Sequence, residues 1–312
     1  MQLRALTLND AEPWADLLAL TFGRSSADMT QLLQWLHAAH DLIAWGAWDG
    51  VRLVAQYSSL LIALWLPHLA SLACVGLSVN MAVHPDYRGR GLVKRVAQPV
   101  YAALLERGGL AGIGFSNAAG VKVDRRSKGY GYRVIGRMQS ILIWLRPGPV
   151  IAPLRLTTDW PAALFDFGPP LDDCIRFAAS PLLIRHRFAQ HPFRRYEFGV
   201  WEEENKVCGV VVHRTIRWGA LRGAALLAAY SHDLPRLLMC WACALRENGI
   251  RFGHALTTLA SPTRAALKQN GLCLTLPYTR SPYYLTVKPL RDDTPPFLLD
   301  FTRWDCCGGD IL

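Results

Sequence analysis

The chain has 312 residues, which is enough for about two domains of ordinary size and a well-buried core. A hydrophobic content of 51% and an aromatic content of 10% exclude a disordered or fibrous protein. The formal net charge of +10 favours anionic partners. However, the 34 Lys and Arg residues are spread along the chain without a basic run, so we do not expect nucleic-acid binding.

Residues 1–145 alternate between short apolar runs and amphipathic segments, as is typical of an α/β protein with a central sheet. The predicted elements, in chain order, are a strand over 2–8, helices over 12–22 and 28–39, strands over 42–49, 51–64 and 74–83, a helix over 92–107, a strand over 111–116, a helix over 118–128 and a strand over 132–145. Asp49-Gly50 is the predicted hairpin turn between the second and third strands. These elements predict a mixed, twisted sheet flanked by helices.

The segment from Tyr57 to Val83 has no acidic or basic residue except His68 and is long enough to span a bilayer. Pro67-His68 divides it into halves rich in Val, Ser, Ala and Leu, a composition that suits two buried strands joined by a turn. We therefore predict two strands here and no membrane span.

Three prolines and a glycine between Arg146 and Pro153 disfavour both a helix and an inner strand, so we place a domain boundary there. The predicted domains are residues 1–147 and 154–312. The second domain has predicted helices over 180–190, 234–247 and 262–271, and predicted strands over 196–202, 206–218, 220–230, 250–258, 272–280 and 283–290. This order loosely repeats that of the first domain, which indicates an internal duplication.

The chain has eight cysteines, and its N-terminus lacks the apolar core of a signal peptide, so we expect reduced thiols and a cytoplasmic protein. Cys240 and Cys243 have CxxC spacing, but they lie in an apolar segment with helical periodicity and no strand-to-helix turn before it. We expect both cysteines in the core, and we predict no metal site.

The segment "MAVHPDYRGRGLVKRV", residues 81–96, joins an apolar strand to a basic helix through a loop with two glycines. The loop and first helical residues are Arg88, Gly89, Arg90, Gly91, Leu92 and Val93. Glycines let successive N–H groups converge, and the helix adds the positive end of its dipole, so this loop suits a diphosphate. Its spacing matches neither GxxxxGK[ST] nor GxGxxG. An ordinary turn with surface arginines is the alternative.

This loop resembles the acyl-CoA pyrophosphate loop of the GNAT superfamily of N-acyltransferases. Arg88 and Gly91 fit the family pattern, whereas Val93 stands where the family prefers Gly or Ala. A second segment also resembles the family: a strand ends in Asn117, a helix follows, and Gly129-Tyr130 opens the next strand. Because two matches occur at the family's spacing, we expect a GNAT-like fold, repeated as a degenerate second domain.

The resemblance implies that the fourth and fifth strands splay apart and that the pantetheine arm of an acyl-CoA lies between them. Met81, Ala82 and Val83 would line that gap, and the N–H near Met81 would polarise the thioester carbonyl. The donor would be acetyl-CoA or another acyl-CoA. The acceptor would be a primary amine of a small molecule or peptide, which attacks directly without an acyl-enzyme intermediate.

The acid and base are less clearly marked. Family members often place a Glu on the fourth strand, where this chain has only Ser78 and Asn80, and a Tyr seven residues after the Asn, where this chain has Asp124. Tyr130 is a further candidate acid. The alternatives are a solvated helix residue for Asp124 and a packing residue for Tyr130. These departures leave open a non-catalytic sensor of acyl-CoA.

The second domain has "SHDLPR" where the first has its glycine loop, so we do not expect it to bind CoA. We expect it to shape the acceptor site, with purely structural support as the alternative. His186 and His191 could contact a substrate, with a hydrogen-bonded structural role as the alternative for each. A longer acyl-CoA or an acyl-carrier protein as donor, and a monomer or a homodimer, also remain open.

Overall fold

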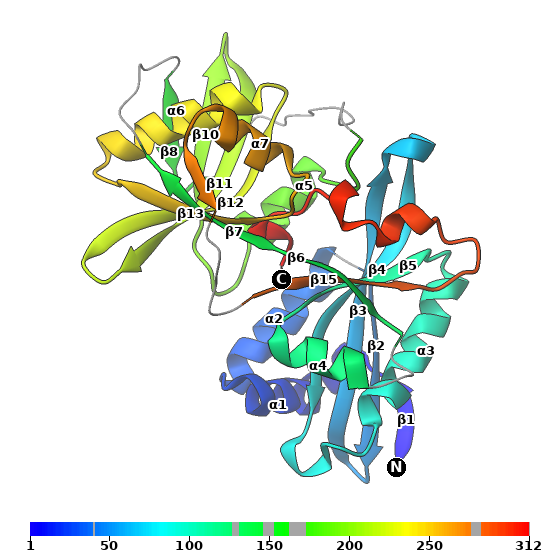
Figure 1. Ribbon diagram of the computed structural model, residues 1–312. Coiled ribbons are helices and arrows are strands. Elements are labelled where there is room, and N and C mark those ends of the chain that lie inside the picture. The colour runs from blue at the N-terminus through cyan, green and yellow to red at the C-terminus, as the bar shows by residue number, and fades with distance from the viewer. Residues whose placement is uncertain (40, 127–130, 146–152, 162–172, 276–281, 312) are drawn as a thin grey trace. The chain divides into compact units, whose positions relative to one another are not determined.

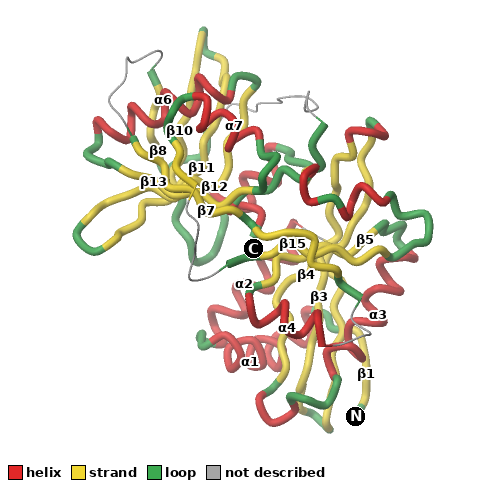
Figure 2. Tube along the Cα trace, viewed as in Figure 1, coloured by secondary structure: helices red, strands yellow, loops and turns green. Residues whose placement is uncertain are grey.

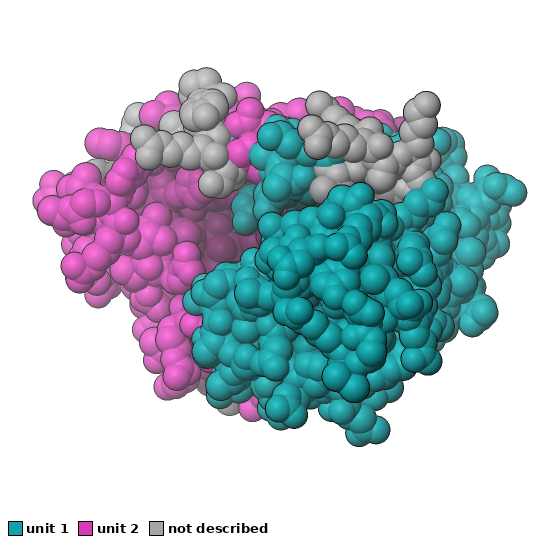
Figure 3. Space-filling view, turned by 90° about the horizontal axis from the view of Figure 1, so that it is seen from below, with its two compact units in different colours: residues 1–66, 70–136, 283–299 teal, residues 67–69, 137–282, 300–312 magenta. Residues whose placement is uncertain are grey.

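The computed structural model describes residues 1–39, 41–126, 131–145, 153–161, 173–275 and 282–311 (Figure 1). The chain divides into two compact units (Figure 3). The first unit comprises Met1–Leu66, Ala70–Gly136 and Tyr283–Leu299, and the second comprises Pro67–Leu69, Arg137–Pro282 and Asp300–Leu312. Each unit therefore includes sequence from both halves of the chain.

The first unit is built on a mixed sheet with the strand order β1-β2-β3-β4-β5-β15-β6. Its strands are β1 (Gln2–Ala5), β2 (Asp41–Asp49), β3 (Arg52–Leu66), β4 (Ser71–Val83), β5 (Ala111–Ser116), β15 (Tyr284–Pro289) and β6 (Arg133–Arg137). Neighbours from β1 to β4 are antiparallel, β4 and β5 are parallel, and β5 and β15 are antiparallel. A hairpin turn joins β2 to β3, but its two residues are Gly50 and Val51, one position later than the predicted Asp49-Gly50, because Asp49 already pairs with Arg52; Gly50 has a positive φ of 58°.

Four α-helices accompany this sheet in the described part of the first unit: α1 (Ala11–Phe22), α2 (Ser26–Ala39), α3 (Leu92–Glu106) and α4 (Ala118–Arg126). Short 3-10 turns, η1 (Leu8–Asp10) and η3 (Pro85–Tyr87), precede α1 and α3. The apolar face of α3 packs on β2 and β3 through Val96, Val100 and Leu104, which are fully buried. Helix α1 packs on α2 and against β3 and β4 (Figure 2). The loop before α3 is thereby held at one end of a rigid core.

The second unit has a sheet of the order β14-β7-β13-β12-β11-β10-β8. Its strands are β8 (Leu154–Thr157), β10 (Glu197–Glu203), β11 (Lys206–Trp218), β12 (Leu221–Ser231), β13 (Phe252–Thr257), β7 (Gln139–Trp144) and β14 (Cys273–Thr275). Its helices are α5 (Pro181–Ile184), α6 (Leu234–Glu247) and α7 (Pro262–Gln269), and a short strand is β9 (Arg176–Phe177). Its shorter turns are the π turn η4 (Arg185–Ala189) and the 3-10 turns η2 (Pro67–Leu69), η6 (Phe301–Arg303) and η7 (Gly308–Asp310). The 3-10 turn η5 (Pro296–Leu299) belongs to the first unit. Helices α6 and α7 pack on the sheet, with Cys240 and Cys243 buried on α6 as predicted.

The two sheets have the same strand order, and the parallel pairs β4–β5 in the first and β12–β13 in the second occupy the same place in it. The internal duplication predicted from the sequence is confirmed by this match. In each sheet one position is filled from the other half of the chain: β15 lies beside β5 in the first, and β7 lies beside β13 in the second. The two halves thus exchange one strand each.

The exchange corrects one predicted element. Residues 132–145 were expected to form one strand, but β6 ends at Arg137 and β7 begins at Gln139 in the other sheet. The chain passes between the sheets at the buried Met138 without a glycine or proline turn, so the sequence shows no break there. The predicted domain of residues 1–147 therefore contains a strand of the second sheet, and 154–312 contains a strand of the first.

The apolar segment of residues 57–83 forms β3 and β4 with η2 between them, which confirms the two-strand prediction. Among the described residues, no helix has the length and apolar character needed to cross a membrane.

Candidate active site

Strands β4 and β5 separate after a short stretch of pairing. They pair in parallel only where Gly76 and Leu77 face Gly112 and Ile113. Beyond this point β4 continues to Val83 against β3, and β5 continues to Ser116 against β15. We call the unpaired stretch between the two strands, toward their carboxyl ends, the gap; the family resemblance implied such a separation. Backbone groups on both sides of such a gap can pair with an extended ligand.

A β-bulge lies on β4 beside this gap. Gln56 pairs with Ala82 and Ser58 pairs with Val79, so both Asn80 and Met81 stand opposite a single residue of β3. Asn80 has a φ of +50°, in the left-handed region that Asn tolerates better than most residues. Bulges interrupt the ladder and re-aim the backbone. This backbone conformation accounts for the asparagine type at position 80 without a catalytic role.

The loop from Arg88 to Gly91 joins η3 to α3 at the open end of β4. Gly89 and Gly91 have φ values of +78° and +69°, and a methyl group on either would meet no other atom within 4 Å. Their requirement for glycine is therefore conformational rather than steric. Among the described residues, no acceptor contacts the backbone N–H groups of residues 89–94. These free donors at a helix N-terminus form a site for an anion.

The cationic side chains of this loop are exposed and support it. Arg88 Nε donates to the carbonyl oxygen of Val83 at 3.4 Å, and Arg90 Nη2 donates to that of Asp86 at 2.9 Å. The Arg90 guanidinium also lies 4.7 Å from the ring centroid of Tyr87. Within the described part of the chain, neither arginine forms an ion pair with a carboxylate. Both guanidinium groups retain N–H donors for a phosphate.

Asn117 stands between β5 and α4. Its Oδ1 atom accepts hydrogen bonds from the backbone N–H groups of Ala119 at 3.1 Å and Gly120 at 2.9 Å. These bonds satisfy donors in the first turn of α4, so the helix-capping role expected for this residue type is present. The side-chain nitrogen is not used in this cap.

The structure describes only some of the predicted catalytic residues. Ser78 and Asn80 lie on β4, half-buried, on the stretch that borders the gap. Asp124 lies on α4, but its side chain is outside the described residues, as is all of Tyr130. Two of the predicted polar residues, Ser78 and Asn80, thus lie on β4. The assignment of the acid and the base stays a prediction.

Sequence reasoning missed the buried tyrosine cluster beside the narrow end of the gap. The hydroxyl groups of Tyr57 and Tyr132 lie 3.0 Å apart, and the Tyr101 ring meets that of Tyr57 edge-on at 5.6 Å. A methyl group on Gly112 would lie 2.5 Å from the Tyr132 hydroxyl oxygen, so Tyr132 can pack on β5 only because glycine occurs there. The available signal in the sequence was the pair of glycines at alternate positions, 112 and 114, of "AGIGFS", because they leave room for a large side chain on one face of the strand.

Lys288 of β15 was also missed, because the sequence places β15 in the second half. Its Nζ lies 4.7 Å from the centroid of the Tyr101 ring, close enough for a cation–π contact. Burial lowers the pKa of Lys288. Thr286 on the same strand donates a hydrogen bond from Oγ1 to the Gly114 carbonyl oxygen at 3.0 Å. Strand β15 thus braces the β5 side of the gap.

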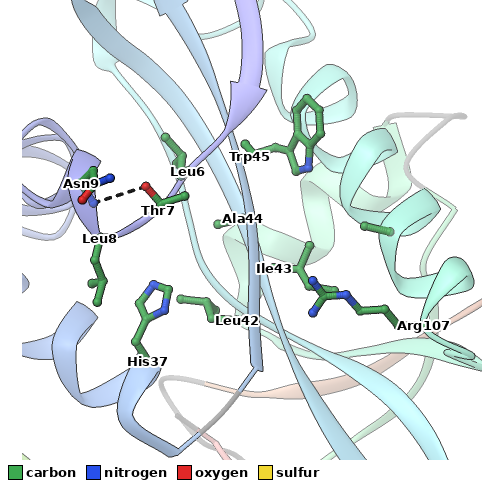
Figure 4. A pocket seen from close by; sticks show the side chains of 12 residues that line it. Leu6, Thr7, Leu8, Asn9, His37, Leu42, Ile43, Ala44, Trp45 and Arg107 are labelled. Carbon is green, nitrogen blue, oxygen red and sulfur yellow. Dashed lines mark hydrogen bonds between the residues drawn. The ribbon is translucent and has the colours of Figure 1, made fainter.

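A separate cavity of about 560 Å³ lies at the opposite end of α3 (Figure 4). It is bordered by the β1–η1 connection, by His37 on α2, by β2 and by Arg107. Because α3 is 15 residues long, this cavity is about 20 Å from the glycine loop along the helix axis. It therefore does not belong to the gap.

In the described part of the second unit, the helix terminus that corresponds to the glycine loop is capped by the protein itself. The helix that follows β12 is capped by Asp233, whose Oδ1 accepts from the Arg236 N–H at 3.1 Å, and Pro235 in its first turn has no N–H. His191 Nδ1 accepts from the N–H groups of Phe193 and Arg194 at 3.1 and 3.2 Å. Burial lowers the pKa of His191 to about 4, which suits this acceptor role.

His186 is buried in the π turn η4, and its Nδ1 lies 3.2 Å from Oε1 of Gln190. Both histidines considered as substrate contacts thus form local hydrogen bonds within the second unit.

Comparison with known proteins agrees with this geometry. Residues 2–133 match the family model of the acetyltransferase (GNAT) domain. No curated protein sequence matches the chain.

Solved structures with the same fold include a probable N-acyltransferase of Enterococcus faecalis and a GCN5-related N-acetyltransferase of Anabaena variabilis. The first has a TM-score of 0.68 and 12% identity and covers 95% of this chain and 74% of its own. The second has a TM-score of 0.67 and 10% identity and covers 93% and 73%. At such identities the likeness shows the fold. Residues 2–133 thus match the GNAT acetyltransferase domain, and the second unit repeats the strand order of the first sheet.

Proposed function

We propose that the protein transfers an acyl group from an acyl-CoA, with acetyl-CoA as the first donor to test, to a primary amine of a small molecule or peptide. The observation that carries this proposal is the row of backbone N–H groups over residues 89–94. These groups have no acceptor among the described residues and stand at the open end of the β4–β5 gap. Such a row suits the diphosphate of CoA.

In this proposal the donor is bound almost entirely by backbone. The N–H groups from Gly89 to Val93, including those of Arg90, Gly91 and Leu92, hold the diphosphate, and the Arg88 and Arg90 side chains add charge-assisted hydrogen bonds. The pantetheine arm then runs along Met81, Ala82 and Val83, which border the gap. Asn117 would donate from its side-chain amide nitrogen, which the helix cap does not use.

The bulge at Asn80 and Met81 re-aims the backbone on the wall of the gap along which the thioester would lie. A backbone N–H near Met81 would stabilise the negative charge that develops on the thioester oxygen as the amine attacks. Ser78 and Asn80 would guide a proton from the amine through water, and Asp124 or Tyr130 would protonate the departing thiolate. No nucleophilic side chain is required, because the amine attacks the thioester directly.

We assign donor binding to the N-terminal domain of residues 1–147, completed by β15, and acceptor shaping to residues 154–312. The capped helix α6 supports this division, because it leaves the second unit without a comparable site for a diphosphate.

The test measures the unfolding temperature with and without acetyl-CoA, and CoA thiol release with a panel of amines. Arg88→Ala should weaken CoA binding by about tenfold or more, since hydrogen bonds to charged groups contribute about 1.5–3 kcal/mol. Arg24→Ala is the matched control, because Arg24 is an exposed arginine that follows α1 and is far from the loop in sequence. Absence of stabilisation by any acyl-CoA would overturn the proposal.

A non-catalytic acyl-CoA sensor is the second candidate. It is favoured by β4 itself, where the stretch from Ser78 to Val83 carries no carboxylate and no imidazole. A sensor would bind acyl-CoA and release no thiol with any amine, and acyl-carrier-protein or longer acyl donors would not change that result.

A further inference from the structure

The second unit contains a gap that corresponds to the one in the first. Strands β12 and β13 pair in parallel where Gly223–Leu226 faces Phe252–Ala255. Beyond this stretch β12 continues to Ser231 against β11, and β13 continues to Thr257 against β7. The parallel pair of this sheet therefore opens toward its carboxyl ends in the same place in the strand order as β4 and β5.

The end of the chain lies along one wall of this gap. Cys307 forms an antiparallel bridge with Thr257 of β13. The Thr258 N–H donates to the Cys306 carbonyl oxygen at 3.0 Å, and the Cys306 N–H donates to Thr258 Oγ1 at 3.0 Å. Residues 306 and 307 thus occupy the hydrogen-bonding groups at the end of β13. In an open gap, a bound ligand would pair with these same groups.

Two glycines then carry the chain across to the other wall. A methyl group on Gly308 would lie 3.6 Å from Cβ of Leu256 on β13 and 3.7 Å from Cδ2 of Leu227 on β12. A methyl group on Gly309 would lie 2.8 Å from the Leu227 carbonyl oxygen and 3.0 Å from Cζ of Phe188. The chain therefore touches both strands, and at Gly309 it lies too close to β12 for any side chain.

The segment is anchored on both sides of the glycines. Trp304 and Cys306 are fully buried before them. After them, Asp310 Oδ2 accepts a hydrogen bond from the Cys307 N–H at 2.7 Å and closes the turn η7, and Arg187 Nη1 lies 3.8 Å from Asp310 Oδ1. The turn is thus fixed by its own side chains.

We propose that residues 304–311 are the resident occupant of the gap in the second unit, so that the protein has a single gap in which an acyl-CoA can bind. The occupant is a segment of the same chain, held by backbone pairing, glycine contact and an aspartate cap. The position of the segment does not depend on any donor or acceptor, whereas the single acyl-CoA gap rests on the proposed function.

The test compares two neighbouring substitutions in the full-length protein without CoA, followed by hydrogen exchange. Gly309→Ala must displace either the segment or Leu227, because its methyl group would meet a backbone atom, whereas Gly308→Ala has room at ordinary contact distances. We expect Gly309→Ala to raise amide exchange over residues 227–231 and 256–258 by about tenfold or more, with Gly308→Ala close to wild type. Equal exchange in the two variants would overturn the proposal.

If Gly309→Ala fails to fold, Asp310→Ala replaces it, because this change removes the acceptor of the Cys307 N–H without adding an atom to the gap. Increased exchange over the same residues supports the proposal, and unchanged exchange overturns it. Equilibrium dialysis with CoA then counts the sites in the wild-type protein. One site per chain agrees with an occupied second gap, and two sites overturn it. A count of zero argues against the proposed function, while the exchange data still decide the position of the segment.

Discussion

Strand β15 leads to the prediction that residues 1–147 will not fold into a stable CoA-binding unit. The strand comes from the far end of the chain, yet it pairs with β5 over six residues, from Tyr284 opposite Ser116 to Pro289 opposite Ala111. Without it, β5 becomes an open edge beside the gap, and β7 remains attached without the strands it pairs with.

The size of the loss follows from what β15 buries. Leu285 and Val287 are fully buried, and each contributes about 1.5–3 kcal/mol of hydrophobic free energy. The buried hydrogen bond from Thr286 to Gly114 adds about 1 kcal/mol. Together these contributions reach about 4–7 kcal/mol, which is comparable with the whole unfolding free energy of an ordinary domain, about 5–15 kcal/mol.

The assay compares urea unfolding and CoA-induced thermal stabilisation of three proteins. These are the full chain, residues 1–147, and residues 1–136 joined to residues 283–299 by a flexible Gly-Ser linker of about ten residues, which can connect neighbouring strands. We expect a cooperative transition in the full chain and in the joined protein, and none in residues 1–147. Cooperative unfolding of residues 1–147 with the same urea dependence as the joined protein would refute the stabilising role of β15.

Two further predictions concern single residues. Gly91→Ala and Gly23→Ala should each lower stability by about 1–2 kcal/mol, because both glycines have a positive φ and open space around them, but calorimetric titration should show weaker CoA binding only for Gly91→Ala. Burial lowers the pKa of His191 to about 4, so between pH 6.5 and 4 the unfolded chain binds a proton that the folded chain does not, and stability falls as pH is lowered. His191→Asn, which keeps an acceptor for the N–H groups at 193 and 194, should flatten this dependence in thermal unfolding between pH 7 and 4, and an equal slope in both proteins would show that His191 is not its cause.

The features that sequence reasoning predicted well are those fixed by local chemistry. The hairpin turn that begins at Gly50 follows from the backbone freedom of glycine, although it lies one residue later than predicted, and so does the loop with Gly89 and Gly91. The capping role of Asn117 follows from the reach of its side chain to the next turn. Each of these needs only neighbouring residues, so the sequence contains the whole cause.

The features that it missed depend on partners far away in the chain. Residues 284–289 have the composition of a strand, but composition does not say which sheet receives the strand. The buried pair of Tyr57 and Tyr132 joins residues 75 positions apart, and the glycine at 112 is explained only once Tyr132 is seen against it. Such pairings are selected by packing in three dimensions, which local propensity does not encode.

A comparison of the two gaps shows that the strand order of the sheet produces the gap, whereas the loop before the helix produces the anion site. In both sheets the pairing ends early between the corresponding parallel strands, β4–β5 and β12–β13, so the gap itself is a product of the strand order. In the first unit, glycines at 89 and 91 leave the helix N-terminus free of acceptors among the described residues, whereas in the second Asp233 occupies that terminus and the end of the chain lies in the gap. Because free donors at the end of an open gap need an anion and capped ones do not, the donor site we propose depends on the loop sequence rather than on the fold.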